Sequence, residues 1–181
     1  ENARQIIYQL KKIESPCKEA FDENYNFGSA ELEPLLDWLS ENTSDIDLEE
    51  GSIEQTLDIN PLKTGKGLEL TKTRVEGKGD QGSVVIILNA GDIDGENATL
   101  NVRGQSISVD IPLIARQRYA QRKAANGAIS YVSSFTIRMP SIEEAQAFLR
   151  ALKKLSPMAK DFQMERMKSL SDPENALSKI K

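Results

Sequence analysis

The side chains of this sequence that could carry chemistry are carboxylates, lysines, arginines and tyrosines, because the chain contains no histidine. The lack of histidine excludes serine–histidine and cysteine–histidine nucleophile systems, and it excludes zinc sites that need a histidine ligand. Cys17 is the single cysteine, so an internal disulfide and a cysteine-based zinc site are excluded as well. An enzyme built from this sequence would therefore use carboxylates, lysine, tyrosine or a metal ion bound through oxygen.

Basic side chains gather around Tyr119. They are Arg116, Arg118, Arg122 and Lys123. Residues 97–142 contain six bases against the single acid Asp110. Arginine interleaved with an aromatic residue is typical of contact with nucleic acid or an anionic surface. No nucleic-acid motif accompanies the cluster, so nucleic acid is not an expected partner, and we favour pairing with acids of the N-terminal region. Arg116 and Arg118 remain candidates for binding an anionic ligand.

Two acidic stretches could bind a hard cation through oxygen atoms. One lies within residues 45–50, and the other, residues 92–96, has the sequence DIDGE. The second resembles the start of a calcium-binding loop, but its spacing does not complete an EF-hand, so we predict no metal site. Residues 77–82, GKGDQG, match a dinucleotide fingerprint by letter. They lie between two expected strands and open no helix, so we reject that interpretation.

The elements that must position these side chains begin with helices. Apolar residues recur at helical spacing over residues 6–13, and Ser15-Pro16 ends that segment or starts the next. A leucine-rich helical face follows over residues 32–39. Residues 42–51 are acidic and loop-like, so we place a boundary after residue 51.

From residue 52 the apolar residues recur with the period of two that is typical of β-strands. We expect strands over residues 53–59, 68–75 and 83–88, a hairpin over 98–111, and a final strand over 129–139. The β-branched run in the third strand predicts burial on both of its faces. For residues 114–126 we expect a short helix or a long loop.

Residues 141–156 carry the clearest helix signals. Ser141 lies three residues before Glu144, which is the spacing of a capping box. An apolar stripe then includes Leu149 and Leu152, which we expect to pack on the final strand. Ser156-Pro157 should end the helix and leave residues 157–181 as a loosely docked tail.

This order of elements predicts an α+β fold, with an antiparallel sheet or partly open β-barrel capped by a C-terminal helix. The closing stretch YVSSFTIRMPSIEEAQAFLRALKKL resembles the end of the pleckstrin-homology-like (PH-like) superfold, and more narrowly that of small bacterial domains of this shape. The resemblance covers residues 52–156. It divides the chain into an acidic helical extension (1–51), a PH-like sheet with its capping helix (52–156) and the tail (157–181).

The resemblance also implies a phosphate site. Phosphoinositide-binding members of the superfold place a lysine near the first loop and a Lys/Arg-x-Arg pair on the second strand. The matching residues are Lys66, Lys72 and Arg74. Side chains two residues apart on a strand share a face, so Lys72 and Arg74 could reach one phosphate. We nevertheless favour solvated lysines on an edge strand, where they oppose sheet-to-sheet aggregation.

Charge is distributed unevenly along the chain. Residues 1–51 carry 13 acids against 4 bases, and the rest carries 15 acids against 19 bases. This asymmetry favours two regions of different character, or an acidic helical face that covers a basic sheet. No apolar run approaches the roughly 18–20 residues that span a bilayer. The sequence begins at Glu1 without methionine, and we favour an exported bacterial protein over a cytoplasmic one.

These features predict a non-enzymatic binding or protein-interaction module with a protein partner and no cofactor. One alternative is a binder of anionic lipid or a phosphate ligand through the basic second strand. Another is a hydrolase that uses paired carboxylates or a divalent cation. Buried carboxylates with raised pKa values in a concave pocket would favour the hydrolase.

Overall fold

The protein has an α+β fold, seen in a computed structural model that describes residues 2–43, 46–50, 53–62, 67–76 and 80–171. The helices are α1 (Asn2–Asn24), α2 (Leu32–Thr43) and α3 (Ile142–Ser171), with short 3-10 turns η1 (Ala90–Asp92), η2 (Gly95–Asn97) and η3 (Ile114–Arg116). The strands are β1 (Ile46–Glu50), β2 (Ile53–Pro61), β3 (Gly67–Glu76), β4 (Asp80–Asn89), β5 (Thr99–Arg103), β6 (Ser106–Pro112), β7 (Ala120–Lys123), β8 (Ile129–Val132) and β9 (Ser134–Met139).

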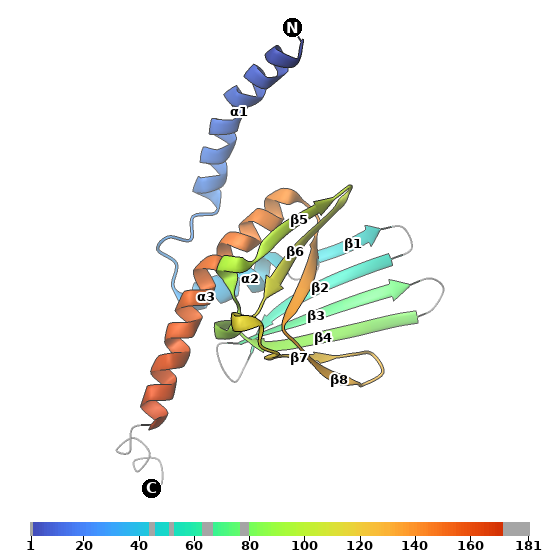
Figure 1. Ribbon diagram of the computed structural model, residues 1–181, viewed down its shortest axis with the longest axis vertical. Coiled ribbons are helices and arrows are strands. Elements are labelled where there is room, and N and C mark those ends of the chain that lie inside the picture. The colour runs from blue at the N-terminus through green and yellow to red at the C-terminus, as the bar shows by residue number, and fades with distance from the viewer. Residues whose placement is uncertain (1, 44–45, 51–52, 63–66, 77–79, 172–181) are drawn as a thin grey trace.

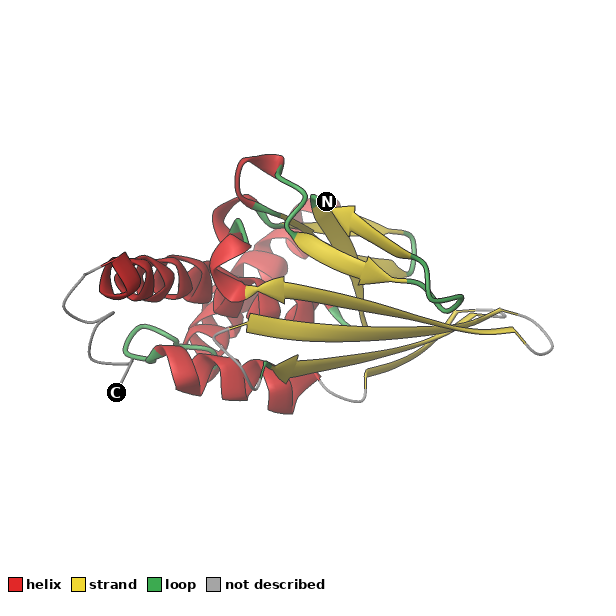
Figure 2. Ribbon diagram, turned by 90° about the horizontal axis from the view of Figure 1, so that it is seen from below, coloured by secondary structure: helices red, strands yellow, loops and turns green. Residues whose placement is uncertain are grey.

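The strands form two antiparallel sheets. The larger has the order β1-β2-β3-β4-β7-β8, and the smaller has the order β5-β6-β9. Figure 2 shows the smaller sheet stacked over the larger one, with the helices gathered toward one end of both. In the described residues no strand pairing joins the two sheets. The expected α+β class, C-terminal helix and N-terminal helices are confirmed, whereas the partly open barrel is wrong because the sheets do not close.

The core lies between the two sheets and the helices α2 and α3. Alternation along each strand directs one set of side chains inward, as with Leu57 and Ile59 on β2. Other large contributors to this cluster include Leu35, Leu36, Leu39, Leu68, Leu70, Ile86, Leu88, Ile93, Val109, Ile111, Leu113, Phe135, Ile137, Met139, Phe148, Leu152 and Leu155. On β4 only one face is buried, because Val85 and Ile87 are half-exposed. The expectation that this strand is buried on both faces is therefore wrong.

Ser133 separates two strands where the sequence predicted one. β8 pairs with β7 in the larger sheet, and β9 pairs with β6 in the smaller. The backbone N–H of Leu113 donates to the carbonyl oxygen of Ser133 at 2.8 Å, which holds the chain at the point where it changes sheets. Phe135 is consequently buried while Tyr131 is exposed, although both have the same phase in the sequence pattern.

Two strands lie where the sequence predicted loops. β1 pairs with β2 from Ile46 opposite Leu57 to Glu50 opposite Ile53, so the boundary placed after residue 51 falls inside a paired hairpin. β7 pairs with both β4 and β8, within the segment expected to be a short helix or loop. Both strands are short, and neighbouring strands satisfy their backbone groups, which a local sequence pattern does not reveal.

Helix α3 continues through Pro157 to Ser171, so the expected helix end at Ser156-Pro157 is wrong. A proline inside a helix removes one backbone hydrogen bond and costs about 3 kcal/mol. Contacts on both sides of Pro157 compensate, because Leu155 and Ala159 are buried. The hydroxyl of Ser156 also donates to the backbone carbonyl of Ile93. Residues 172–181 lie outside the described residues.

Helix α1 likewise runs through a proline, Pro16, without the expected break. Its C-terminal end is attached to α3, where Arg150 pairs with Asp22 and lies 4.3 Å from the centre of the Phe21 ring. Its N-terminal half projects away from the sheets (Figure 1). In that half the apolar side chains from Ile6 to Leu10 are exposed.

Candidate functional site

A groove with exposed apolar side chains lies beside the second half of α3. It has a volume of about 420 Å³ and is formed by α3, η1 and the segment from Ile114 to Tyr119. We call it the α3 groove. Its lining residues are Gly91, Asp92, Ile114, Tyr119, Lys160, Gln163, Met164, Met167 and Lys168.

Close packing of η1 on α3 positions one wall of the α3 groove. A side chain on Gly91 would stand 3.1 Å from the carbonyl oxygen of Ala159, so a glycine lets the two backbones approach. Gly95 allows the same close approach further along α3, where an added Cβ atom would lie 2.5 Å from the carbonyl oxygen of Leu152. The Asn89 side chain accepts a hydrogen bond from the Gly91 N–H at 3.0 Å and caps η1.

The other wall is a helical face of α3. Met164 and Met167 are three residues apart, and Lys160 and Lys168 lie four residues before and after Met164, so all four side chains share one side of the helix. Met164 is 49% exposed, Met167 is 65% exposed and Tyr119 opposite them is 52% exposed. Large apolar side chains that face solvent together in this way mark interaction sites more often than isolated ones do.

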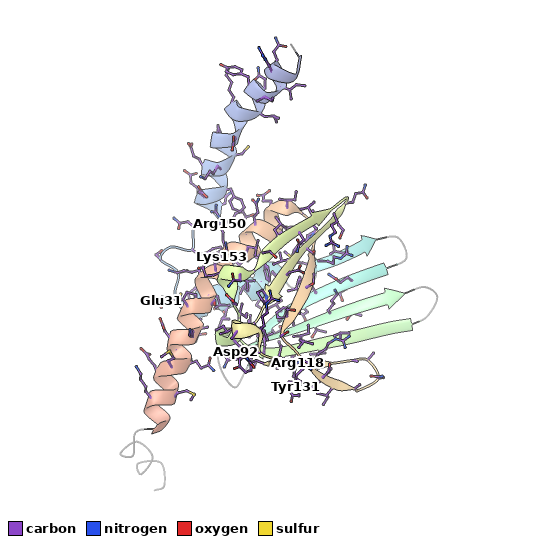
Figure 3. All side chains as sticks on the ribbon, in the orientation of Figure 1. Glu31, Asp92, Arg118, Tyr131, Arg150 and Lys153 are labelled. Carbon is purple, nitrogen blue, oxygen red and sulfur yellow. The ribbon has the colours of Figure 1, made fainter. Side chains whose placement is uncertain are left out.

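Charge around the α3 groove is predominantly basic. Lys160 and Lys168 line it, and Arg118 is exposed directly beside Tyr119. In the view of Figure 3, Asp92 lies between the second half of α3 and Arg118. Burial raises the pKa of the Asp92 carboxyl above its ordinary value, because the charged form loses solvation there.

A raised carboxyl pKa in a concave site is one of the features that would favour a hydrolase. Asp92, however, has neither a second catalytic acid nor a group of metal ligands beside it in the part of the chain that the structure describes. It is the one carboxylate among the groove's lining residues, whereas carboxylate-pair hydrolysis needs a second acid opposite the first. Across the described residues no three Asp, Glu or Cys side chains are grouped so as to hold a metal ion. The α3 groove therefore suits binding better than it suits catalysis.

The four bases of the predicted cluster around Tyr119 do not form one site in the structure. Arg118 is exposed and precedes Tyr119 in the chain, while Arg116 lines a separate polar pocket over the smaller sheet. Arg122 and Lys123 lie on β7 and are exposed. Among the described residues no ion pair joins these four bases to an acid of the N-terminal region, so the pairing that we favoured is absent there.

The predicted phosphate site is only partly described. Lys66 and the side chain of Arg74 lie outside what the structure describes. Lys72 lies on β3, opposite Leu57 on one side and Val84 on the other, and is half-buried. β3 is an interior strand of the larger sheet, so the interpretation of Lys72 as an edge-strand lysine is wrong.

The sequence pattern missed the contribution of α3 to the α3 groove. Met164 and Met167 are visible in the sequence, but the expected stop at Pro157 removed them from any helix. Their spacing of three residues was the signal that could have identified a helical face. No local pattern brings them beside Tyr119, because that contact joins segments more than forty residues apart.

Within the described residues no helix combines the length and the apolar character needed to cross a membrane. No protein-family model, no curated protein and no solved structure matches this chain.

Proposed function

We propose that this protein is a non-enzymatic protein-interaction module and that the α3 groove is its docking site. The observation that carries the proposal is the exposure of Met164, Met167 and Tyr119 around one concave surface. Methionine has a flexible, polarizable side chain and is over-represented at surfaces that adapt to a partner. The PH-like resemblance remains a prediction and does not contribute to this argument.

The helical wall of the α3 groove favours a helix as the partner element. One wall is itself a helix, and an amphipathic helix laid along it would insert apolar side chains at positions i, i+3, i+4 and i+7. Met164 and Met167 offer contacts from one side, and Ile114 and Tyr119 offer them from the other. Such a partner would bury the apolar side chains that are exposed in the free protein.

The charge of the rim favours an acidic partner. Lys160 and Lys168 line the groove beside its apolar side chains, and Asp92 is the one acid among its lining residues. Complementary charge raises the association rate and selects against basic partners. Helix α1 of a second copy fits less well, because residues 2–13 contain three bases and no acid. We therefore assign the groove to an acidic amphipathic helix of another protein.

Two labelled synthetic peptides test this assignment. Both are amphipathic helices with the same apolar face, and one carries glutamate where the other carries lysine on the polar face. We expect fluorescence anisotropy to show tighter binding of the acidic peptide, with a difference that shrinks as salt is added. The double variant Met164→Ser/Met167→Ser should bind it at least about tenfold more weakly. Ile129→Ser, which removes an equally exposed apolar side chain from β8, is the matched control.

The same measurements can reject the proposal. Equal binding of the two peptides, or unchanged binding by the double methionine variant, would contradict docking in the α3 groove. Co-sedimentation with vesicles that contain phosphatidylserine tests the anionic-lipid alternative at low salt, where attraction between charges is least screened. Vesicle binding that persists in the double methionine variant would favour that alternative instead.

A further inference from the structure

A second concave site lies on the outer face of the smaller sheet, and nothing in the proposed docking function uses it. It has a volume of about 420 Å³, which is within the range of sites for small molecules. We call it the Arg116 pocket. Its polar lining includes Asn97, Thr99, Asp110, Arg116, Ser134 and Thr136.

Strand register assembles the floor of the Arg116 pocket. Thr99 on β5 is opposite Asp110 on β6, and Asp110 is opposite Thr136 on β9, so three polar side chains form a row across the sheet. Their neighbours along β6 and β9, such as Val109 and Ile137, are buried on the opposite face. A polar row above an apolar layer is what alternation along a strand produces.

Protein hydrogen bonds hold the Asp110 carboxylate in one orientation. Thr136 donates its hydroxyl hydrogen to one carboxylate oxygen at 2.6 Å, and the Asn101 amide donates to the other. A carboxylate has about four acceptor sites, so about two remain for a ligand. An oriented carboxylate with acceptor sites to spare is suited to receive ligand hydroxyl groups.

Arg116 enters the pocket lining from a strained turn. Ala115 has φ of 51° and Arg116 has φ of 52°, a left-handed conformation that residues other than glycine rarely adopt. Hydrogen bonds from the Arg116 N–H to Leu113 O (2.9 Å) and from the Gln117 N–H to Ile114 O (3.1 Å) hold the turn. Strain of this kind gathers at ligand sites, where the surrounding structure maintains it.

The arginine has no anionic partner among the described residues of the protein. A guanidinium group presents paired N–H donors that match a carboxylate or a phosphate. The hydroxyl groups of Thr99 and Ser134 nearby can each donate or accept a hydrogen bond, and the Thr136 hydroxyl, whose hydrogen goes to Asp110, can still accept one. The pocket thus offers one cation, one carboxylate and several hydroxyl groups to a single small molecule.

We propose that the Arg116 pocket binds a small polyhydroxylated anion, such as a sugar acid or a sugar phosphate. The anionic group pairs with Arg116, and adjacent hydroxyl groups of the ligand donate to Asp110 and exchange hydrogen bonds with Thr99 and Ser134. A long apolar ligand has no matching surface here. A neutral sugar leaves the arginine unpaired, so it binds more weakly than its acid.

Nuclear magnetic resonance titration of the whole chain tests the proposal with glucuronate, glucose 6-phosphate and glucose as probes. At about 10 mM probe, binding with a dissociation constant near 1 mM would be readily seen. We expect glucuronate or glucose 6-phosphate to shift the backbone signals of Thr99, Asp110 and Thr136, and glucose to shift them much less. A response to glucuronate alone identifies a carboxylate ligand, and a response to glucose 6-phosphate alone identifies a phosphate ligand.

Variants of the two neighbouring arginines make the test specific. Arg116→Gln should weaken binding at least about tenfold, and Arg116→Lys should weaken it less because it keeps the charge without the paired donors. Arg118→Gln removes the same charge two residues away, outside the pocket, and should bind as the parent does. Unchanged thermal unfolding would show that each variant is folded. Absent shifts with both anions, equal response to glucose, or equal loss in the two glutamine variants would overturn the proposal.

Discussion

The hydroxyl of Ser156 donates a hydrogen bond to the backbone carbonyl oxygen of Ile93, and both residues are buried. The bond ties the middle of α3 to the segment between η1 and η2. It lies beside Pro157, where the helix has lost one of its own backbone bonds. This contact and the buried Ala159 keep the second half of α3 in place, and with it one wall of the α3 groove.

Ser156→Ala should therefore destabilise the protein. The substitution leaves the buried carbonyl of Ile93 without this donor, and such a loss costs about 1–3 kcal/mol. We expect urea unfolding to show a decrease of that size in the free energy of unfolding. Ser130→Ala, at an exposed position on β8, is the control and should have little effect. Equal stability of the two variants would show that the hydrogen bond does not hold α3.

Gly95→Ala should also be destabilising, for a steric reason. The added Cβ atom would lie 2.5 Å from the carbonyl oxygen of Leu152 and 2.9 Å from its carbonyl carbon, both of which are backbone atoms of α3. The helix would have to move, and overpacking of this kind costs about 1–3 kcal/mol. Thermal unfolding measures the effect. Gly28→Ala provides a comparison, because there the nearest atom is the side-chain oxygen of Asn26 at 3.0 Å and no backbone atom is in the way.

Much of the secondary structure follows from local sequence signals. The N-terminal half of the expected capping box is present, since Ser141 Oγ accepts from the Glu144 N–H at 3.1 Å, and the Ser141 hydroxyl donates to Glu144 Oε2 at 2.9 Å. The leucine face of α2 is buried as its spacing predicts. These predictions are correct because each depends on residues that lie within one or two helical turns of one another.

The errors occur where distant contacts decide the outcome. Pro157 is a local stop signal that packing against η1 overrides, and Ser133 divides a regular alternation because the chain changes sheets there. The candidate site shows the same limit. Arg116 and Arg118 were identifiable as basic residues near Tyr119, but the methionines of α3 and the polar row at Asp110 join them only through tertiary structure.

Leu152→Ala and Lys153→Ala should separate the two faces of α3. Leu152 is 1% exposed and belongs to the core, so its truncation removes buried surface and leaves a cavity, at a cost of about 2–5 kcal/mol. Lys153 is exposed, so Lys153→Ala should lower the free energy of unfolding only slightly. Denaturant unfolding of both variants is the measurement. Similar small effects would mean that this segment of α3 does not form the core.

Asp92→Asn should stabilise the protein at neutral pH, although it removes a charge from a proposed functional site. Burial raises the pKa of Asp92 in the folded state, whereas the unfolded chain keeps a value of about 4. Between these two values the folded state retains a proton that the unfolded state has lost, so stability falls as pH rises through the folded-state pKa. Asparagine does not titrate, so the variant does not lose stability in this way as pH rises.

The advantage of Asp92→Asn over the parent should therefore be present at pH 7 and disappear below about pH 4, as measured by urea unfolding at both values. Asp161→Asn, which removes an exposed carboxylate from α3, controls for net charge. If Asp92→Asn is less stable than the parent at pH 7, the carboxylate makes a favourable contact that outweighs its burial, and Asp92 supports the fold instead of weakening it.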